Sequence, residues 1–186
     1  LPVTGIVNEA VRSKIRQMVD TYVIISTDPP DGYFADVAYN AWYYNAVQAV
    51  YVRNLFSGTG AYIFEPETTM TRAMFVSVLW RLDGSPVAAP CNFADIPRGK
   101  WYTAAVDWAT ASGVVSGVDA THFAPDATVT REQIAALLYR YAIYKGYDTT
   151  QTAALTFSDA AQVSAFAEQP LRWALGMGFV SGRGGG

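Results

Sequence analysis

Two arginines follow threonines at the start of two predicted helices, which is an unusual place for a cation. They are Arg72, after Thr71, and Arg131, after Thr130. A positive charge in the first helical turn interacts unfavourably with the helix dipole, by roughly 0.3–1 kcal/mol. Because the arginine occurs at this position in both helices, we expect another interaction to offset this cost. A helix N-terminus with a guanidinium group can bind a carboxylate or a phosphate. Alternatively, each arginine pairs with an acidic residue of a neighbouring segment, and both interpretations stay open. The candidate acids are Asp36, Asp95 and Asp159.

The two threonines are predicted to be helix N-caps. In Thr130-Arg-Glu-Gln133, the Thr130 hydroxyl can accept the Gln133 amide while the Gln133 side chain reaches back to the Thr130 amide, which forms a capping box. The first copy, Thr71-Arg-Ala-Met74, keeps the threonine and the arginine. Its methionine is expected not to close the box.

Both motifs lie in a segment that repeats with an offset of 59 residues and no gap. A repeat of this length is typical of stacked modules, none of which can bury its apolar face alone. A third, partial copy contains Phe157-Ser-Asp159 and Trp173. The matched pairs are Phe34/Phe93, Asp36/Asp95, Trp42/Trp101, Gly58/Gly117, Pro66/Pro125, Thr71/Thr130 and Arg72/Arg131.

Each full copy shows two helical patterns separated by a loop with a glycine and a Phe-x-Pro motif, so we predict an all-α fold of tandem helix-loop-helix repeats. Apolar residues recur at three- and four-residue steps, as on one face of a helix. Gly113 and Asn54 are expected to end the first helices in the left-handed conformation. The apolar faces are Tyr43, Ala46, Val47 and Val50, then Phe75, Val78, Leu79 and Leu82, and in the second copy Tyr102, Ala105, Val106 and Ala109, then Ile134, Leu137, Leu138 and Tyr141.

The predicted organisation is an N-terminal helix and linker at 1–32, a first repeat at 33–90, a second at 91–150 and a partial third at 151–186. The N-terminal helix is expected over 6–22. In the third repeat, Pro170 falls inside the expected first helix, so it either kinks that helix or marks its start.

The partial third repeat lacks a second helix within the sequence. The apolar face of its first helix is therefore expected to stay exposed, unless the chain continues past Gly186, another chain covers the face, or the helix at 6–22 packs there. This face consists of Leu171, Trp173, Ala174 and Leu175.

Composition excludes several functional classes. The hydrophobic fraction is 51% and the net charge is −3, with no block of basic residues, which argues against nucleic-acid binding. No apolar stretch is long enough to span a membrane. The single cysteine, Cys91, cannot form an intramolecular disulfide, and the single histidine, His122, is expected in a turn. No catalytic triad, metal cluster or phosphate loop is present, so neither an enzyme nor a cofactor is predicted.

The ordered motifs Phe-x-Asp, Trp-Tyr, Ala-Val, Gly-x-x-x-Gly, Phe-x-Pro and Thr-Arg resemble the S-layer homology (SLH) module over residues 34–182. The resemblance implies an extracellular, non-covalent anchor at the bacterial cell surface. Its partner would be a secondary cell wall polysaccharide linked to peptidoglycan, often with acidic ketal-pyruvate groups. The family fold implies three repeats around a pseudo-threefold axis, with ligand grooves between adjacent repeats.

This resemblance gives each candidate site residue a role. The arginines would bind the ligand carboxylate, the aspartates would accept hydrogen bonds from sugar hydroxyls, the tryptophans would stack on sugar faces and the glycines would allow close backbone approach. The family's Thr-Arg-Ala-Glu motif has Met74 and Gln133 in place of its glutamate. The candidates are Arg72, Arg131, Asp36, Asp95, Trp42, Trp101, Gly58 and Gly117.

Two other functions compete with anchoring. The first is a structural module that associates with itself and has no carbohydrate site of its own. The second is a glycosidase with Asp36 and Asp95 as its two carboxylates. Their equivalence by repeat argues against catalysis, which needs two carboxylates in different environments. Trp108 and Trp173 are expected in the core, whereas Trp42 and Trp101 can lie in the core or at the surface.

Overall fold

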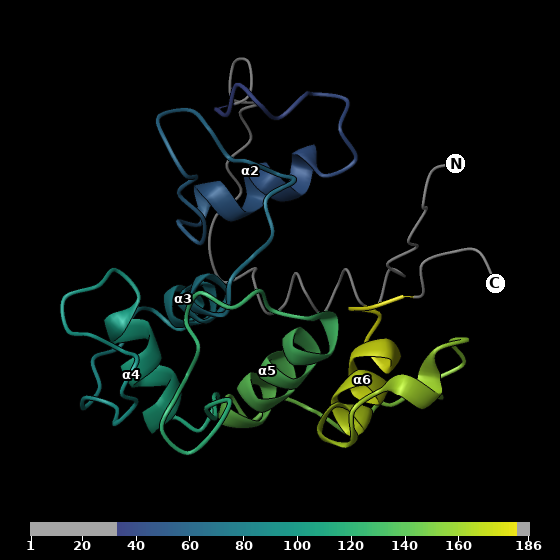
Figure 1. Ribbon diagram of the computed structural model, residues 1–186. Coiled ribbons are helices and arrows are strands. Elements are labelled where there is room, and N and C mark those ends of the chain that lie inside the picture. The colour runs from purple at the N-terminus through teal and green to yellow at the C-terminus, as the bar shows by residue number, and fades with distance from the viewer. Residues whose placement is uncertain (1–32, 182–186) are drawn as a thin grey trace. The chain divides into compact units, whose positions relative to one another are not determined.

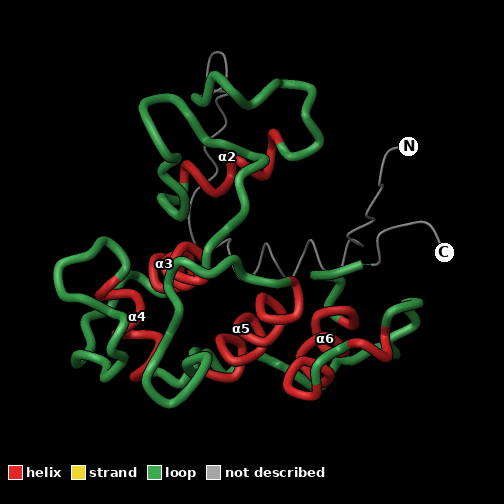
Figure 2. The backbone as a smooth tube through the Cα atoms, in the orientation of Figure 1, coloured by secondary structure: helices red, strands yellow, loops and turns green. Residues whose placement is uncertain are grey.

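The computed structural model describes residues 33–181, so the helix predicted at 6–22 and the linker that follows it lie outside the described residues. Within this range every regular element is helical (Figures 1 and 2). The all-α prediction is confirmed, and the pseudo-threefold arrangement stays a prediction. The elements are α2 (Tyr44–Val52), α3 (Arg72–Leu82), α4 (Thr103–Ala111), α5 (Arg131–Tyr144) and α6 (Glu168–Gly176), with short 3₁₀ turns η1 (Ala160–Gln162) and η2 (Ala165–Ala167).

The helix ends follow the predicted capping chemistry, with one correction. The Thr130 hydroxyl accepts the Gln133 amide at 3.2 Å, and the Gln133 Oε1 accepts the Thr130 amide at 3.2 Å. Thr71 caps α3 in the same way, but the expectation that Met74 leaves the box open is wrong. The Met74 sulfur lies 3.5 Å from the Thr71 amide nitrogen and accepts a hydrogen bond from it. A thioether sulfur can do so because it is an acceptor, although a weak one.

The residues predicted to end the first helix of each repeat are also confirmed. Asn54 and Gly113 follow the last residues of α2 and α4 with φ of 56° and 72°.

In α6, Pro170 is the third helical residue, where its missing N–H would have had no intrahelical acceptor. The helix therefore begins two residues before the proline and is not interrupted by it.

The two first helices differ in the face that they bury. In α4 the predicted residues Tyr102, Ala105, Val106 and Ala109 are all buried. In α2 the predicted Ala46 is exposed, which is a correction. The buried residues of α2 are Tyr44 and Val47, and they pack with Phe34 and Val37.

Helices pack across the repeat boundary. In the part of the structure formed by residues 33–112 and 116–129, α3 of the first repeat packs against α4 of the second. In the part formed by residues 113–115 and 130–181, α5 of the second repeat packs against α6 of the third. The second helix of each of these repeats thus meets the first helix of the next repeat.

This pairing corrects the expectation of an exposed face on the third repeat. Leu171, Trp173 and Ala174 are buried in a cluster that includes Ala135 and Ala142 of α5. The face is covered because its partner is the second helix of the preceding repeat, which the sequence already contains. The core positions predicted for Trp108 and Trp173 are confirmed, since both are 3% exposed.

The loops of the two full repeats share their main-chain hydrogen bonds. The Ala35 amide donates to the Tyr62 carbonyl at 2.8 Å, and the equivalent Ala94 amide donates to the Thr121 carbonyl at 2.8 Å. The turn after Phe34 and Phe93 also recurs at Phe157, whose carbonyl accepts the Ala160 amide. The sequence repeat is therefore a structural repeat at the level of individual bonds.

Candidate ligand-binding site

An aspartate joins the two loops of each full repeat. The Asp95 carboxylate accepts the amides of Phe123 and Ala124, with shortest distances of 2.9 and 2.6 Å. Asp36 accepts the amides of Phe64 and Glu65 at 2.9 and 2.6 Å. The two predicted hydroxyl acceptors are thus also the residues that fix the Phe-x-Pro loop.

These bonds also determine the charge state of the aspartates. Burial acts to raise the pKa of Asp95, but the hydrogen bonds from the Phe123 and Ala124 amides outweigh it, and the pKa lies below the ordinary value of 3.8. The pKa of Asp36 is lowered in the same way, with burial opposed by its two amide donors. Both carboxylates are therefore ionised at neutral pH.

Two glycines bring loop backbone against an aromatic ring. A methyl group on Gly117 would lie 2.7 Å from the Phe93 ring and would collide with the carbonyl oxygens of Asp119 and His122. Gly58, with φ of 77°, has the equivalent contacts with Phe34 and the Ile63 carbonyl. The two glycines thus permit close packing of the loop backbone. The groups that approach them are rings and carbonyl oxygens of the protein and not a ligand.

Arg72 lies in the interior. It is 6% exposed, its Nε donates to the Phe123 carbonyl at 2.9 Å and its guanidinium carbon lies 4.8 Å from the centre of the Phe123 ring. A second guanidinium nitrogen lies 3.4 Å from the Ser116 carbonyl. The arginine therefore ties α3 to two loop segments of the second repeat.

Arg131 makes an equivalent contact from the surface. Its Nη2 donates to the Ser181 carbonyl at 2.8 Å. Ser116 and Ser181 hold the same place in their repeats, within Gly113-Val-Val-Ser-Gly117 and Gly178-Phe-Val-Ser-Gly182. A carbonyl of the following repeat is a partner that the sequence interpretation did not include.

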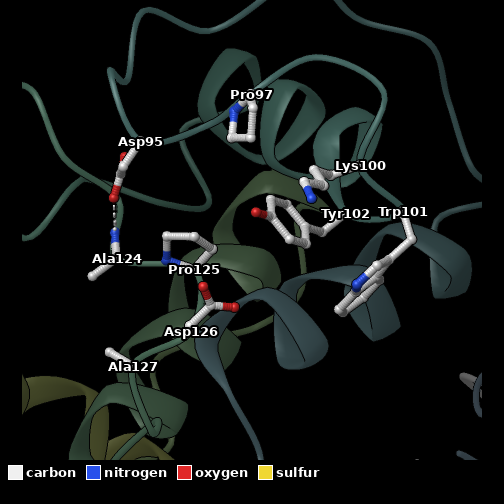
Figure 3. Close-up of a pocket in the computed structure, with 9 residues that line it drawn as sticks. All are labelled: Asp95, Pro97, Lys100, Trp101, Tyr102, Ala124, Pro125, Asp126 and Ala127. Atoms are coloured by element: carbon white, nitrogen blue, oxygen red, sulfur yellow. Dashed lines mark hydrogen bonds between the residues drawn. The ribbon is translucent and has the colours of Figure 1, made fainter.

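A pocket of about 650 Å³ lies beside the Phe-x-Pro loop of the second repeat (Figure 3). Of the eight predicted site residues, Asp95 and Trp101 line it. Lys100, Tyr102 and Asp126 also contribute, and the sequence interpretation did not name them as ligand-binding. The lining residues are Asp95, Pro97, Lys100, Trp101, Tyr102, Ala124, Pro125, Asp126 and Ala127.

The tryptophans at the equivalent positions are exposed, Trp101 to 57% and Trp42 to 92%. Trp101 contacts Tyr102 edge to face, with ring centres 5.2 Å apart. Burial, followed by the negative charges of Asp126 and Asp95, raises the pKa of Tyr102. The pocket therefore combines an accessible aromatic face, a protonated phenol, a cation and carboxylates.

The segment that carries Lys100 and Trp101 is held from both sides. The Thr103 hydroxyl accepts the Lys100 amide at 3.1 Å and donates to the Pro97 carbonyl at 2.9 Å. Arg98 forms two hydrogen bonds with the buried Asp107 of α4, at 3.0 and 2.7 Å. Fixed backbone on this side reduces the ordering cost of ligand binding.

The described residues form an α-helical protein of tandem repeats, and its second repeat carries a pocket lined by polar and aromatic side chains. The family model described as S-layer homology domain matches residues 33–74 and 92–135. The chain therefore carries S-layer homology domains, and such domains anchor proteins at the cell surface.

Known proteins of two kinds are similar to the chain. An amylopullulanase of Thermoanaerobacterium thermosulfurigenes is 29% identical over 82% of the chain and 8% of its own length. An endoglucanase of Bacillus sp. (strain KSM-635) is 29% identical over 80% of the chain and 16% of its length. The surface-layer 125 kDa protein of Lysinibacillus sphaericus is 27% identical over 74% and 11%. The chain thus spans less than a fifth of each of these proteins.

Residues 33–181 contain neither a candidate membrane span nor a candidate metal site. None of the helices there has the length and apolar character needed to cross a membrane. The described residues also bring no three histidine, cysteine, aspartate or glutamate side chains together as a metal site. His122 lies in a surface loop, where its ring nitrogen is 3.1 Å from Asp119.

Proposed function

We propose that this region is the non-catalytic anchor of a longer surface protein, and that it binds an acidic secondary cell wall polysaccharide. The observation that carries the proposal is the second-repeat pocket, in which the exposed Trp101 lies beside hydrogen-bonding and charged side chains. A sugar offers an apolar ring face and a rim of hydroxyl groups, so it matches this combination. Pyruvate ketals on the polymer would add carboxylates.

The eight candidate residues divide into two groups in this proposal. Trp101 and the equivalent Trp42 provide exposed faces for sugar rings. Arg131 is exposed and uses one nitrogen for Ser181, so other N–H groups of its guanidinium can meet a ligand carboxylate. The remaining candidates act mainly by shaping the binding loops; they are Arg72, Asp36, Asp95, Gly58 and Gly117.

The test is co-sedimentation of the full chain with purified cell walls, before and after acid extraction of the secondary polymer. We expect binding to intact walls and its loss after extraction. Trp101→Ala should weaken binding, whereas Val87→Ala, at a position 99% exposed, serves as the control. Equal binding to extracted walls, or full binding by Trp101→Ala with the same thermal stability as the wild type, would contradict the proposal.

Self-association is the second candidate, and the exposed aromatic side chains of the first repeat favour it. Tyr39 is 84% exposed and Trp42 is 92% exposed. Apolar surface of this kind promotes association. Sedimentation velocity over a range of protein concentrations distinguishes the candidates, since self-association predicts a concentration-dependent oligomer that Trp42→Ala and Tyr39→Ala together abolish.

A further inference from the structure

The two S-layer homology repeats share the hydrogen bonds that fix their loops, but the charges around the pocket differ. Lys100 of the second repeat corresponds to Ala41 of the first. On the opposite loop, Ala124 corresponds to Glu65, and Asp126 corresponds to Glu67. The second repeat therefore places a cation where the first has a methyl group, while the first carries an additional carboxylate.

Resting on the proposed function, we propose that the second-repeat pocket selects carboxylated sugars through Lys100, and that the corresponding surface of the first repeat does not bind them. The proposal assigns a ligand class to one repeat and a specificity-determining residue to its pocket. It predicts that the two repeats, although built alike, contribute unequally to binding an acidic polymer.

Lys100 is available for a ligand. Its side chain is exposed, and among residues 33–181 no carboxylate lies within ion-pair distance of its ammonium group. Its main chain is fixed by the Thr103 hydroxyl, which is itself held by the Pro97 carbonyl. Thr103 is 5% exposed, so this anchor is buried. A lysine on a fixed backbone keeps its charge close to the pocket.

The groups around Lys100 can bind the hydroxyl groups and the ring face of a sugar whose carboxylate contacts the lysine. Figure 3 shows the Lys100 nitrogen beside the Tyr102 ring, the Tyr102 hydroxyl directed towards Pro125, Asp126 next to Pro125 and Trp101 on the far side of Tyr102 from Pro125. A carboxylate on the ligand can meet the ammonium group, hydroxyl groups can donate to Asp126 and exchange hydrogen bonds with the Tyr102 phenol, and the ring face can lie on Trp101. Asp126 on the opposite side would repel a ligand carboxylate and so favours one orientation of the sugar.

The corresponding surface of the first repeat opposes an anion. Glu65 has a left-handed backbone, with φ of 58°, and its amide is held by Asp36 at 2.6 Å, so the position of its Cα is fixed on the loop. Glu65 and Glu67 are both exposed. With Ala41 opposite them, no cation at the equivalent place offsets these charges, and a ligand carboxylate would be repelled.

The experiment compares native wall polysaccharide with the same polymer after carbodiimide activation and borohydride reduction, which converts each carboxylate into a primary alcohol. Affinities are measured by surface plasmon resonance with the full chain. We expect the wild type to bind the native polymer about tenfold more tightly, which corresponds to about 1.4 kcal/mol. Lys100→Ala should bind both polymers equally.

Two further variants serve as controls for charge and location. Lys145→Ala removes the same charge from an exposed position on a different part of the chain and should keep the preference for the native polymer. Ala41→Lys combined with Glu65→Ala gives the first repeat the charges of the second and should increase the number of chains bound per unit of native polymer, or tighten binding. No change in either quantity would refute the inference for the first repeat.

The outcomes separate the inference from the proposed function. If the wild type binds the native polymer and Lys100→Ala keeps the full preference for it, anchoring stands and the role of Lys100 is refuted. If the wild type shows no preference between native and reduced polymer, selection by carboxylate is refuted while sugar binding stands. If the wild type binds neither polymer, the proposed function fails and the inference fails with it.

Discussion

Replacement of Arg72 should destabilise the protein far more than replacement of Arg131, although the two residues occupy the same motif position. Arg72 is 6% exposed, and its Nε donates to the Phe123 carbonyl at 2.9 Å. A hydrogen bond from a charged donor contributes about 1.5–3 kcal/mol, and the contact with the Phe123 ring adds about 0.5–2 kcal/mol. We therefore expect Arg72→Ala to cost about 3 kcal/mol.

Arg131 is exposed and makes its hydrogen bond to the Ser181 carbonyl at the surface. Solvent replaces such a bond easily, so Arg131→Ala should cost about 1 kcal/mol or less. A difference of about 2 kcal/mol corresponds to roughly 4–8 °C in melting temperature for a chain of this size. Arg53→Ala is the matched control, since Arg53 donates to the Ala49 carbonyl within an exposed helix end and its loss should change stability by less than about 0.5 kcal/mol.

The assay is urea unfolding of the full chain followed by circular dichroism, together with wall binding of each folded variant at the same temperature. If Arg72→Ala were no less stable than Arg131→Ala, the interior role of Arg72 would be refuted. If folded Arg72→Ala lost binding while its unfolding free energy stayed at the wild-type value, Arg72 would be a ligand contact and not a residue that stabilises the fold.

Two more predictions concern the loops. Gly117→Ala should lower the free energy of unfolding by about 1–3 kcal/mol, because the added methyl group would meet the Phe93 ring and two carbonyl oxygens. Gly60→Ala is the control and should be nearly neutral, because its methyl group would lie an ordinary 3.8 Å from Ile63. Equal melting temperatures of the two variants would contradict the close approach at Gly117. The free energy of unfolding should be constant from pH 7 to about 5 and should fall as the pH drops through and below 4. The reason is that the pKa of Asp95 in the folded protein lies below its ordinary value of 3.8. A carboxyl group with a lowered pKa stabilises the fold at a pH above its unfolded-state pKa, and this stabilisation is lost as the pH falls through the folded-state pKa. Asp95→Asn should flatten this acid loss in urea titrations, and an unchanged slope would argue against the amide hydrogen bonds.

Local patterns predicted the helices and their ends because the forces concerned act within a few residues. The Thr130 cap and the left-handed Gly113 depend on neighbours within four positions. The partner of α6 could not be found in this way. Burial of Trp173 depends on α5 of the preceding repeat, and the apolar stripe of a helix shows that it needs a partner without showing which one.

The lining of the pocket was predicted less completely than the helices, for a different reason. The sequence repeat marks the positions that the two copies share, and the shared residues Asp95 and Gly117 stabilise the loop. Lys100 was missed because it differs from Ala41. Differences in charge between copies that share their loop hydrogen bonds are the signal that could have located it.

The packing of α3 on α4 has a consequence for building chimaeras from this chain. Residues 71–129 contain one full period, and they include both of these helices, Arg72 and the loop that Arg72 holds. Exchange of modules at 90 and 91, the border read from the sequence, would separate these contacting elements. Junctions before Thr71 and after Val129 would transfer them intact, at the loss of the bond from the Val129 amide to the Met70 carbonyl and of the bond from the Arg81 guanidinium to the Leu55 carbonyl. The unit suited to transplantation therefore starts at the second helix of one repeat and ends just before the second helix of the next, at residues 71–129.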